Sequence, residues 1–480
     1  MNKTYLISQT SSFTILILIS FAFAIIGIYY SKKFKGINNY LTANRSVGLF
    51  SLTTSLTASA LGAWILFGPA SAATWGGLGS IIGYSLGTAF PMFIFIYLGK
   101  KIRKEFPQGS SLIEFMRKKF GKSLFKLILL MTIFYMFIFL CAEVTAVAIL
   151  INYMSGAELW TTALIVLFFT LLYTLYGGLR ASIFTDNIQM IVIIIILIFS
   201  FTYIYSFIGN QFSFSFVKEK NPHLISSSYV TGFTAGLTFF IAVAATNLFH
   251  QGNWQRVYAA KNFETLKKSL IISFFIIIPI VFFMGFSGMV AFSIDSTIRP
   301  DLGFFTLILK DQTTVLSFIV LILGLALTIS TVDTLINAIS SLIVVDGKAV
   351  FNFKKKINYL NFSQYIIVFL SIISFIIASK GFDILYLFLL ADLFCCSFVM
   401  TVFYSFYNKN VKEKTAYISI LTGLICGFLF FPSPDFSKSL LVGVLMPKEL
   451  FTPFISQSLL FLSFVIATFL PFLVIRAKKF

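Results

Sequence analysis

Charged residues are scarce in this sequence. Of its 480 residues, 11% are Asp, Glu, Lys or Arg, whereas 58% are hydrophobic. An ordinary soluble domain carries about 25% charged residues, so a single water-soluble core is excluded. The apolar residues fall in runs of 18 or more, which is about the length that one bilayer-crossing helix requires. The sequence therefore predicts an all-α, polytopic membrane protein embedded in a lipid bilayer.

Cysteine and histidine are also scarce. The four cysteines all lie inside apolar segments: Cys141, Cys395, Cys396 and Cys426. None has the spacing of metal ligands, so they are predicted to be free, buried thiols. A short motif at 285–288 resembles the nucleophile of an intramembrane serine protease, but both histidines precede it, whereas such a serine needs a base from a later helix. We therefore predict neither an enzyme nor a bound cofactor.

Hydropathy predicts thirteen membrane spans. Their approximate ranges are 11–30, 47–74, 78–99, 125–154, 158–176, 181–208, 232–250, 268–293, 314–346, 361–379, 382–406, 415–432 and 455–475. The longest polar connection, about 209–231, is too short to bury a core of its own. Function is therefore expected inside the helical bundle.

The formal net charge of +19 is unevenly distributed. If the N-terminus lies outside, 28 of the 36 Lys and Arg residues fall in cytoplasmic connections, one of which runs from Arg256 to Lys268. This placement obeys the positive-inside rule, so the basic excess indicates topology and not a nucleic-acid partner. We expect a plasma-membrane protein, which in a bacterium means the inner membrane, with its C-terminus in the cytoplasm. No oligomeric state is predicted.

The second predicted span contains helix-breaking residues. After a hydroxyl-rich stretch from Ser51 to Ser59 it carries Gly62, Gly68 and Pro69 at membrane depth. Glycine and proline interrupt helices. Irregular backbone at this depth is tolerated only where it is buried or lines a cavity, and its free carbonyls suit a sodium ion. A simple packing kink is the alternative interpretation.

Polar side chains recur every three or four residues along the ninth predicted span. They are Ser330, Thr331, Asp333, Thr334, Asn337, Ser340 and Ser341. On a helix this spacing forms one stripe. Because an unpaired polar group in hydrocarbon is costly, the stripe is expected to face other helices or a wet cavity. Hydrogen bonding between helices is the alternative to a ligand site.

Several carboxylates fall within predicted spans. Glu143, Asp333 and Asp392 lie deep in apolar segments, and Asp186 and Asp346 lie near cytoplasmic ends. No lysine or arginine is predicted at the same depth. These acids must therefore be protonated, hydrogen-bonded, exposed to a cavity or close to a bound cation. The excess of acids favours a cation pathway, with structural hydrogen bonding as the alternative for any single one.

Four segments together resemble the sodium:solute symporter family, which includes sodium/proline and sodium/sugar symporters. They are 39–45, 173–189, 250–261 and 330–333, with Asp346 closing the last helix. The resemblance implies a LeuT-like fold with an extra helix at 11–30, a five-helix repeat at 47–208, an inverted second repeat at 232–406 and two C-terminal helices at 415–476. It implies sodium-coupled uptake of a small organic solute by alternating access. A proton-coupled symporter of the same fold and a membrane solute sensor are the alternatives.

The resemblance also implies a sodium site. Its ligands would be the backbone carbonyls of Ala58, Leu61 and Leu327 and the hydroxyls of Ser330 and Thr331. All five are hard oxygen donors of the kind that sodium prefers.

Two further positions bear on the ion. Asp186 matches a family aspartate on the sodium exit route toward the cytoplasm, although a salt bridge with nearby Arg180 is the alternative. Some relatives carry an aspartate where this chain has Ala60, so a charge that they use at the site is absent here.

The resemblance places the solute beside the sodium site. The candidate solute-binding residues are Gly62, Trp64, Glu143, Asn247 and Asp392. The counterpart of the broken span in the second repeat would be the segment 232–250. Gly232 and Gly236 suggest only a faint interruption there, so no break is located.

Overall fold

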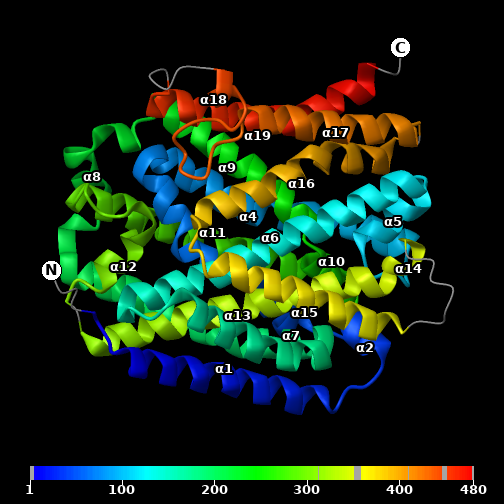
Figure 1. Cartoon of the computed structure of the whole chain (residues 1–480), viewed down its shortest axis with the longest axis horizontal. Helices are drawn as coiled ribbons and strands as arrows, with labels where there is room; N and C mark the ends of the chain where they lie inside the picture. Colours follow the sequence, from blue (N-terminus) through cyan, green and yellow to red (C-terminus); the bar gives the residue numbers. More distant parts are fainter. Residues whose placement is uncertain (1–4, 312, 351–357, 409, 446–450, 478–480) are drawn as a thin grey trace.

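The computed structural model describes residues 5–311, 313–350, 358–408, 410–445 and 451–477. Within these ranges the chain is all-helical (Figure 1). Eleven of the described helices are long and apolar enough to cross a membrane. They are α1 (Gln9–Ser31), α4 (Gly68–Glu105), α6 (Lys122–Ser155), α7 (Leu159–Ile208), α9 (Val230–Phe249), α11 (Phe263–Ile294), α13 (Thr314–Val345), α15 (Tyr359–Ala378), α16 (Ile384–Tyr407), α17 (Glu413–Phe430) and α19 (Pro453–Ala477).

Shorter helices connect or interrupt the long ones. They are α2 (Ile37–Thr42), η1 (Ala43–Arg45), α3 (Leu49–Ala60), η2 (Ala63–Leu66), α5 (Leu112–Lys119), η3 (Gly209–Gln211), α8 (Phe214–Lys220), η4 (Pro222–Ile225), α10 (Gln251–Ala259), η5 (Pro300–Leu302), α12 (Gly303–Ile308), α14 (Gly347–Val350) and α18 (Val442–Leu445). Figure 1 shows α1 at one edge of the bundle and α17 with α19 at the opposite edge.

Two of the long helices each consist of two segments. α4 has 38 residues and α7 has 50, so at 1.5 Å per residue they would measure about 57 and 75 Å, against a hydrocarbon core of about 30 Å. Each is interrupted at a glycine with positive φ, Gly77 (φ 53°) and Gly178 (φ 60°). A Cβ at these positions would lie 2.1 Å from the Leu224 carbonyl oxygen and 2.4 Å from the Tyr40 ring. Chain reversal and close packing thus both depend on these two glycines.

The interruption predicted in the second span is present. α3 ends at Ala60, Leu61 is extended (φ −116°, ψ 91°), and η2 precedes the start of α4. The segment 232–250, predicted as the counterpart of this span, lies in α9. This helix is unbroken at Gly232 and Gly236, and it ends at His250, where ψ is 108°. A Cβ on Gly79 of α4 would lie 2.1 Å from the Gly232 carbonyl oxygen. These glycines therefore permit close packing of α4 on α9.

The polar stripe on α13 faces the interior of the protein, as predicted. All seven of its side chains are buried, and α13 packs against α6, α7, α10 and α15. The cysteines carry no disulfide among the described residues; Cys426 is half-buried, so the prediction of four buried thiols is wrong for that one.

Large apolar side chains are exposed on the outer helices. Examples are Leu18, Phe21 and Ile25 on α1, Ile195 and Ile198 on α7, and Tyr365, Phe369 and Ile372 on α15. Helices that are exposed and apolar on their outward faces suit a lipid environment, where their backbone groups are satisfied internally.

Candidate functional site

The interruption after α3 is stabilised by a carboxylate from another helix. Glu143 of α6 accepts a hydrogen bond from the backbone N–H of Ala63 at 2.8 Å. An N–H at the start of a helix has no intrahelical acceptor, so the carboxylate takes that role. A Cβ at Gly62 would lie 2.1 Å from Oε1 of Glu143, and the glycine therefore leaves the space for this contact. Gly62 and Glu143, both predicted to bind solute, lie here against the backbone of the break.

The last turn of α3 presents carbonyl oxygens toward the break. The N–H of Leu61 is shared between the carbonyls of Thr57 and Ala58, at 3.1 and 3.2 Å. Leu61 itself is extended, so its own carbonyl lies beyond the helix. A carbonyl oxygen has two lone pairs, so the Ala58 carbonyl can accept a ligand beside its shared bond with Leu61. The Leu61 carbonyl lies beyond the last turn and can do the same.

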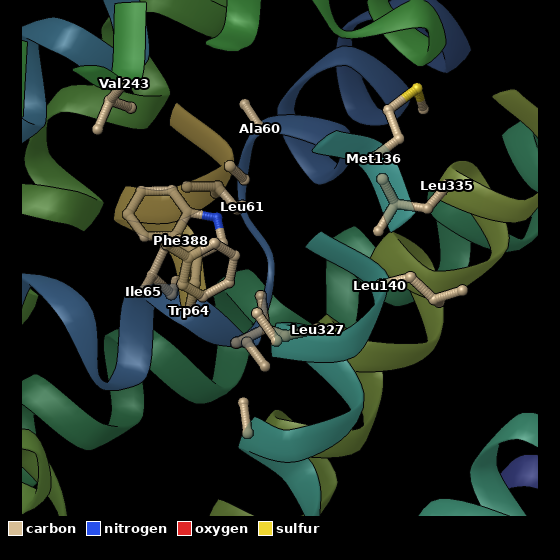
Figure 2. Close-up of a cluster of buried hydrophobic side chains, with 14 of the residues drawn as sticks. Ala60, Leu61, Trp64, Ile65, Met136, Leu140, Val243, Leu327, Leu335 and Phe388 are labelled. Carbon is tan, nitrogen blue, oxygen red and sulfur yellow. The ribbon is translucent and has the colours of Figure 1, made fainter. Parts of the chain in front are cut away.

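The remaining predicted sodium ligands lie on α13, which packs on α3 and η2. Ser330 and Thr331 are 0% and 2% exposed. The Ser330 hydroxyl donates to Oδ1 of Asp186 at 2.6 Å, and the Thr331 hydroxyl donates to the carbonyl of Leu327 at 3.1 Å. A hydroxyl oxygen that donates its proton keeps its lone pairs for a cation. Figure 2 shows Leu61 and Leu327 within the same buried cluster.

Asp186 forms a fully buried ion pair with Arg256 of α10. Nη2 of Arg256 lies 2.8 Å from Oδ2 of Asp186, and both side chains are 0% exposed. The Ser55 hydroxyl donates to the same carboxylate oxygen at 2.5 Å and accepts from Nε of Arg256 at 2.7 Å. The expectation that no arginine lies deep in the bundle is therefore wrong. The alternative of a salt bridge between Asp186 and Arg180 is not found either. The Arg180 guanidinium instead donates to the Ala43 carbonyl and the Ser46 hydroxyl.

One feature of the sequence is consistent with the burial of Arg256. It is the only charged residue in the nine-residue helix α10, and all nine residues are buried. Trp254 and Tyr258 on the same helix are among the largest fully buried side chains. A polar segment with two large aromatic residues and one charge is therefore compatible with a helix that returns into the bundle.

Asp333 is satisfied by hydroxyl groups of α7. It accepts hydrogen bonds from Tyr173 at 2.6 Å, Ser182 at 2.8 Å and Thr185 at 3.2 Å. This arrangement matches the structural alternative for this acid, because the donors come from both segments of α7, on either side of Gly178, and so tie α13 to each of them.

A small cavity of about 20 Å³ lies beside the break. It is lined by Ser59, Ala60, Trp64, Tyr84, Phe139, Val243, Thr246, Asn247, His250, Thr331, Phe388 and Asp392. Three predicted solute residues, Trp64, Asn247 and Asp392, meet here with Thr331 from the predicted sodium ligands. Figure 2 shows Trp64 and Phe388 near Leu61 in this part of the bundle. A volume of this size holds about one water molecule, so the site is nearly closed.

Two larger cavities lie at opposite ends of α13. One of about 1320 Å³ includes Leu309 and Lys310, just before α13 begins, and a second of about 420 Å³ includes Val344 and Val345 at its end. The small central cavity therefore lies between two wider openings. Neither opening is predictable from the sequence, because the walls of each come from segments far apart in the chain.

Comparison with known proteins places the chain in a family. Residues 40–423 match the sodium:solute symporter family. A spermidine transporter of Candida albicans is 28% identical over 394 residues, which cover 81% of this chain and 73% of the relative. A sodium/glucose cotransporter of Vibrio parahaemolyticus is 23% identical over 303 residues, which cover 56% of this chain and 53% of the relative. The chain thus spans about half of the second relative.

Solved structures agree on the fold. A substrate-bound, outward-open structure of a Na⁺-coupled sialic acid symporter superposes with a TM-score of 0.73 at 17% identity, covering 98% of this chain and 97% of that one. MhsT in complex with L-phenylalanine gives a TM-score of 0.52 at 14% identity, covering 91% of this chain and 99% of that one. At these identities the likeness shows the LeuT-like fold alone. Because the family match covers most of the chain, the protein belongs to the sodium:solute symporter family and is a sodium-coupled solute transporter, not an enzyme.

Proposed function

We propose that this protein couples sodium entry to uptake of a small organic solute by alternating access, with sodium between the α3 break and α13. One observation carries the proposal: Ser330 and Thr331 are buried on α13, which packs on α3 and η2, and Thr331 also lines the central cavity. Ion and solute would therefore share a wall. Binding of one can then favour the conformation that binds the other.

The proposed sodium ligands are the carbonyls of Ala58, Leu61 and Leu327 with the hydroxyls of Ser330 and Thr331. Unwound carbonyls and hydroxyls of membrane helices suit a monovalent metal ion that has lost its water. None of the five carries a formal charge. The nearest acid by hydrogen bonding is Asp186, which accepts from Ser330 at 2.6 Å. This position suits its proposed role on the exit route of sodium.

The proposed topology has thirteen spans in two inverted five-helix repeats, at 47–208 and 232–406. The eleven long helices of the described chain become thirteen spans when α4 and α7 are each counted as two segments, with α3 and the start of α4 forming one broken span. α1 begins at the end of the bundle where α8 and α12 lie, whereas α19 finishes at the end near α5 (Figure 1). With an odd number of crossings, the first and last helices must have their outer ends on opposite sides of the membrane. We assign the α5 end to the cytoplasm of a plasma membrane, since its connections carry the basic excess.

Alternating access requires a central site that opens to each side in turn. The larger cavity, on the proposed outer side, and the smaller one, on the cytoplasmic side, would be the two entrances. The central cavity of about 20 Å³ lies between them. Rocking of one repeat against the other would widen it toward one entrance at a time.

One sodium ion supplies enough free energy for uphill transport. A charge that crosses 100 mV yields about 2.3 kcal/mol, and a tenfold sodium gradient adds about 1.4 kcal/mol. The sum of roughly 3.7 kcal/mol supports about 500-fold accumulation of a neutral solute.

Uptake into proteoliposomes tests the coupling. Labelled spermidine, glucose and sialic acid, the solutes in the names of the relatives, serve as the first probes. Uptake of a transported probe should accelerate when external potassium is replaced by sodium at fixed pH. Equal rates in the two salts, or rates that follow an imposed proton gradient, would contradict sodium coupling.

A further inference from the structure

The walls of the central cavity restrict the charge of the solute. Asp392 of α16 lines the cavity and is 4% exposed. Its Oδ1 accepts one hydrogen bond, from the Thr246 hydroxyl at 2.5 Å. No lysine or arginine is among the residues that line the cavity, and the ion pairs found among the described residues do not include Asp392. Within the part of the chain that the structure describes, this carboxylate therefore has no cationic side-chain partner.

Aromatic rings form much of the remaining wall. Trp64 and Tyr84 are stacked with their ring centroids 5.5 Å apart. Phe388 meets Trp64 edge-on at 6.3 Å and Phe139 at 4.6 Å. Ring faces attract an organic cation, most strongly when water is excluded. A bare metal ion would instead need several oxygen ligands around it.

The polar side chains of the wall are mostly bonded within their own helices. The Thr246 hydroxyl, which donates to Asp392, also lies 3.1 Å from the Ala242 carbonyl, and an N–H of Asn247 donates to the Val243 carbonyl. A neutral polyol such as a sugar needs several free hydrogen-bonding partners. A carboxylate solute would face Asp392 with no positive group in the wall to balance it. His250 leaves Nδ1 without a partner, but it forms no ion pair with Asp392.

From this juxtaposition we infer that the solute is an organic cation, whose protonated amine lies against Asp392 within the rings of Trp64, Tyr84, Phe139 and Phe388. This inference rests on the proposed function, since it assigns the charge of the transported solute. An ammonium head donates a charge-assisted hydrogen bond to the free oxygen of the carboxylate and presents its C–H groups to the rings. Because the cavity has room for only about one water molecule, the rings must separate to admit the head group.

A matched set of four-carbon compounds tests the charge directly. 4-Amino-1-butanol, 1,4-butanediol and 4-hydroxybutyrate each have four carbons and a terminal hydroxyl, and they carry a cationic, neutral or anionic group at the other end. The midpoint of thermal unfolding of the purified protein is measured for each in sodium and in potassium. The amine should raise the midpoint, more in sodium, while the diol and the acid should not. Equal stabilisation by the diol or the acid would overturn the inference.

The Asp392→Asn variant tests whether the Asp392 carboxylate binds the amine. It should weaken the apparent affinity for 4-amino-1-butanol by about tenfold or more, because a charge-assisted bond is replaced by a neutral one. Glu219→Gln, which removes an exposed carboxylate on α8 (72% exposed), should leave the affinity within about twofold. Unchanged affinity in Asp392→Asn would overturn the inference, and the three-compound set on the unmodified protein decides it if that variant does not fold.

The same assay separates this inference from the proposed function. If glucose or proline raises the midpoint only in sodium and no amine does, the cation inference fails and sodium coupling stands. If the amine stabilises the protein equally in sodium and potassium, the cation site stands and the coupling fails.

Discussion

Asp186 and Asp392 are both buried carboxylates on long helices, but their surroundings differ. Asp186 receives hydrogen bonds from Ser55 and Ser330 and forms an ion pair with Arg256. Asp392 receives one hydrogen bond and lines a cavity walled by rings. Among the described residues, Asp186 has a cationic partner and Asp392 has none.

The difference separates two uses of a buried acid. A carboxylate that the chain itself neutralises can hold helices together and respond to an ion nearby, but it offers no charge to a solute. A carboxylate that faces a cavity without a partner is costly unless a ligand balances it. The first kind joins α7, α10 and α13, and the second kind lies at the proposed solute site.

The largest expected effect comes from breaking the ion pair. Arg256→Met should lower the free energy of unfolding by about 3–5 kcal/mol, because it leaves a buried charge without a partner. The double variant Arg256→Met/Asp186→Asn should recover part of this loss. Thermal unfolding of purified variants measures both. If the double variant is no more stable than Arg256→Met, the two charges do not balance each other.

An intermediate effect is expected at the break. Gly62→Ala would place a Cβ 2.1 Å from Oε1 of Glu143, and overpacking of this kind costs about 1–3 kcal/mol. Sodium-driven uptake by the Gly62→Ala variant should fall as well. Gly48→Ala is the matched control, because a Cβ there has nothing within 4 Å. Equal uptake and stability in the two alanine variants would contradict the contact between Glu143 and the break.

The smallest effect is expected at Asp435, an ionised acid on the surface of the protein. Hydrogen bonds from Ser433 and Ser437 lower the pKa of Asp435 to about 2. Since the folded pKa lies below the unfolded one, its contribution is present above about pH 4 and is lost as the pH falls through 2. Asp435→Asn should therefore cost less than about 1 kcal/mol at neutral pH, because the group is solvent-exposed. Thermal unfolding at pH 7 checks this, and a loss as large as that of Arg256→Met would contradict the comparison.

The parts of the fold that depend on local sequence were predictable. Hydropathy located the long helices, and Gly62 indicated the interruption that follows α3. The polar stripe from Ser330 to Ser341 correctly indicated a buried face, because its spacing is a property of one helix. The fold class and the family followed from these features and the motifs.

The partners across the bundle were not predictable in the same way. Arg256 falls in a predicted connection, where a positive charge usually meets water, but α10 is entirely buried. The contact of Glu143 with Ala63 joins residues 80 positions apart, and no pattern in either segment indicates it. The four rings that line the cavity with Asp392, those of Trp64, Tyr84, Phe139 and Phe388, likewise come from four separate helices.

Sodium binding to the purified protein tests the central claim most directly. The equilibrium binding of ²²Na⁺ is compared among the unmodified protein, Ser330→Ala/Thr331→Ala and Ser317→Ala. Ser317 is a buried serine whose hydroxyl bonds within the same helix, about 20 Å from Ser330 along α13. The double variant should bind sodium about tenfold or more weakly, since two oxygen ligands are lost, and Ser317→Ala should bind as the unmodified protein does. Sodium affinity that is the same in all three proteins would contradict a site between the α3 break and α13.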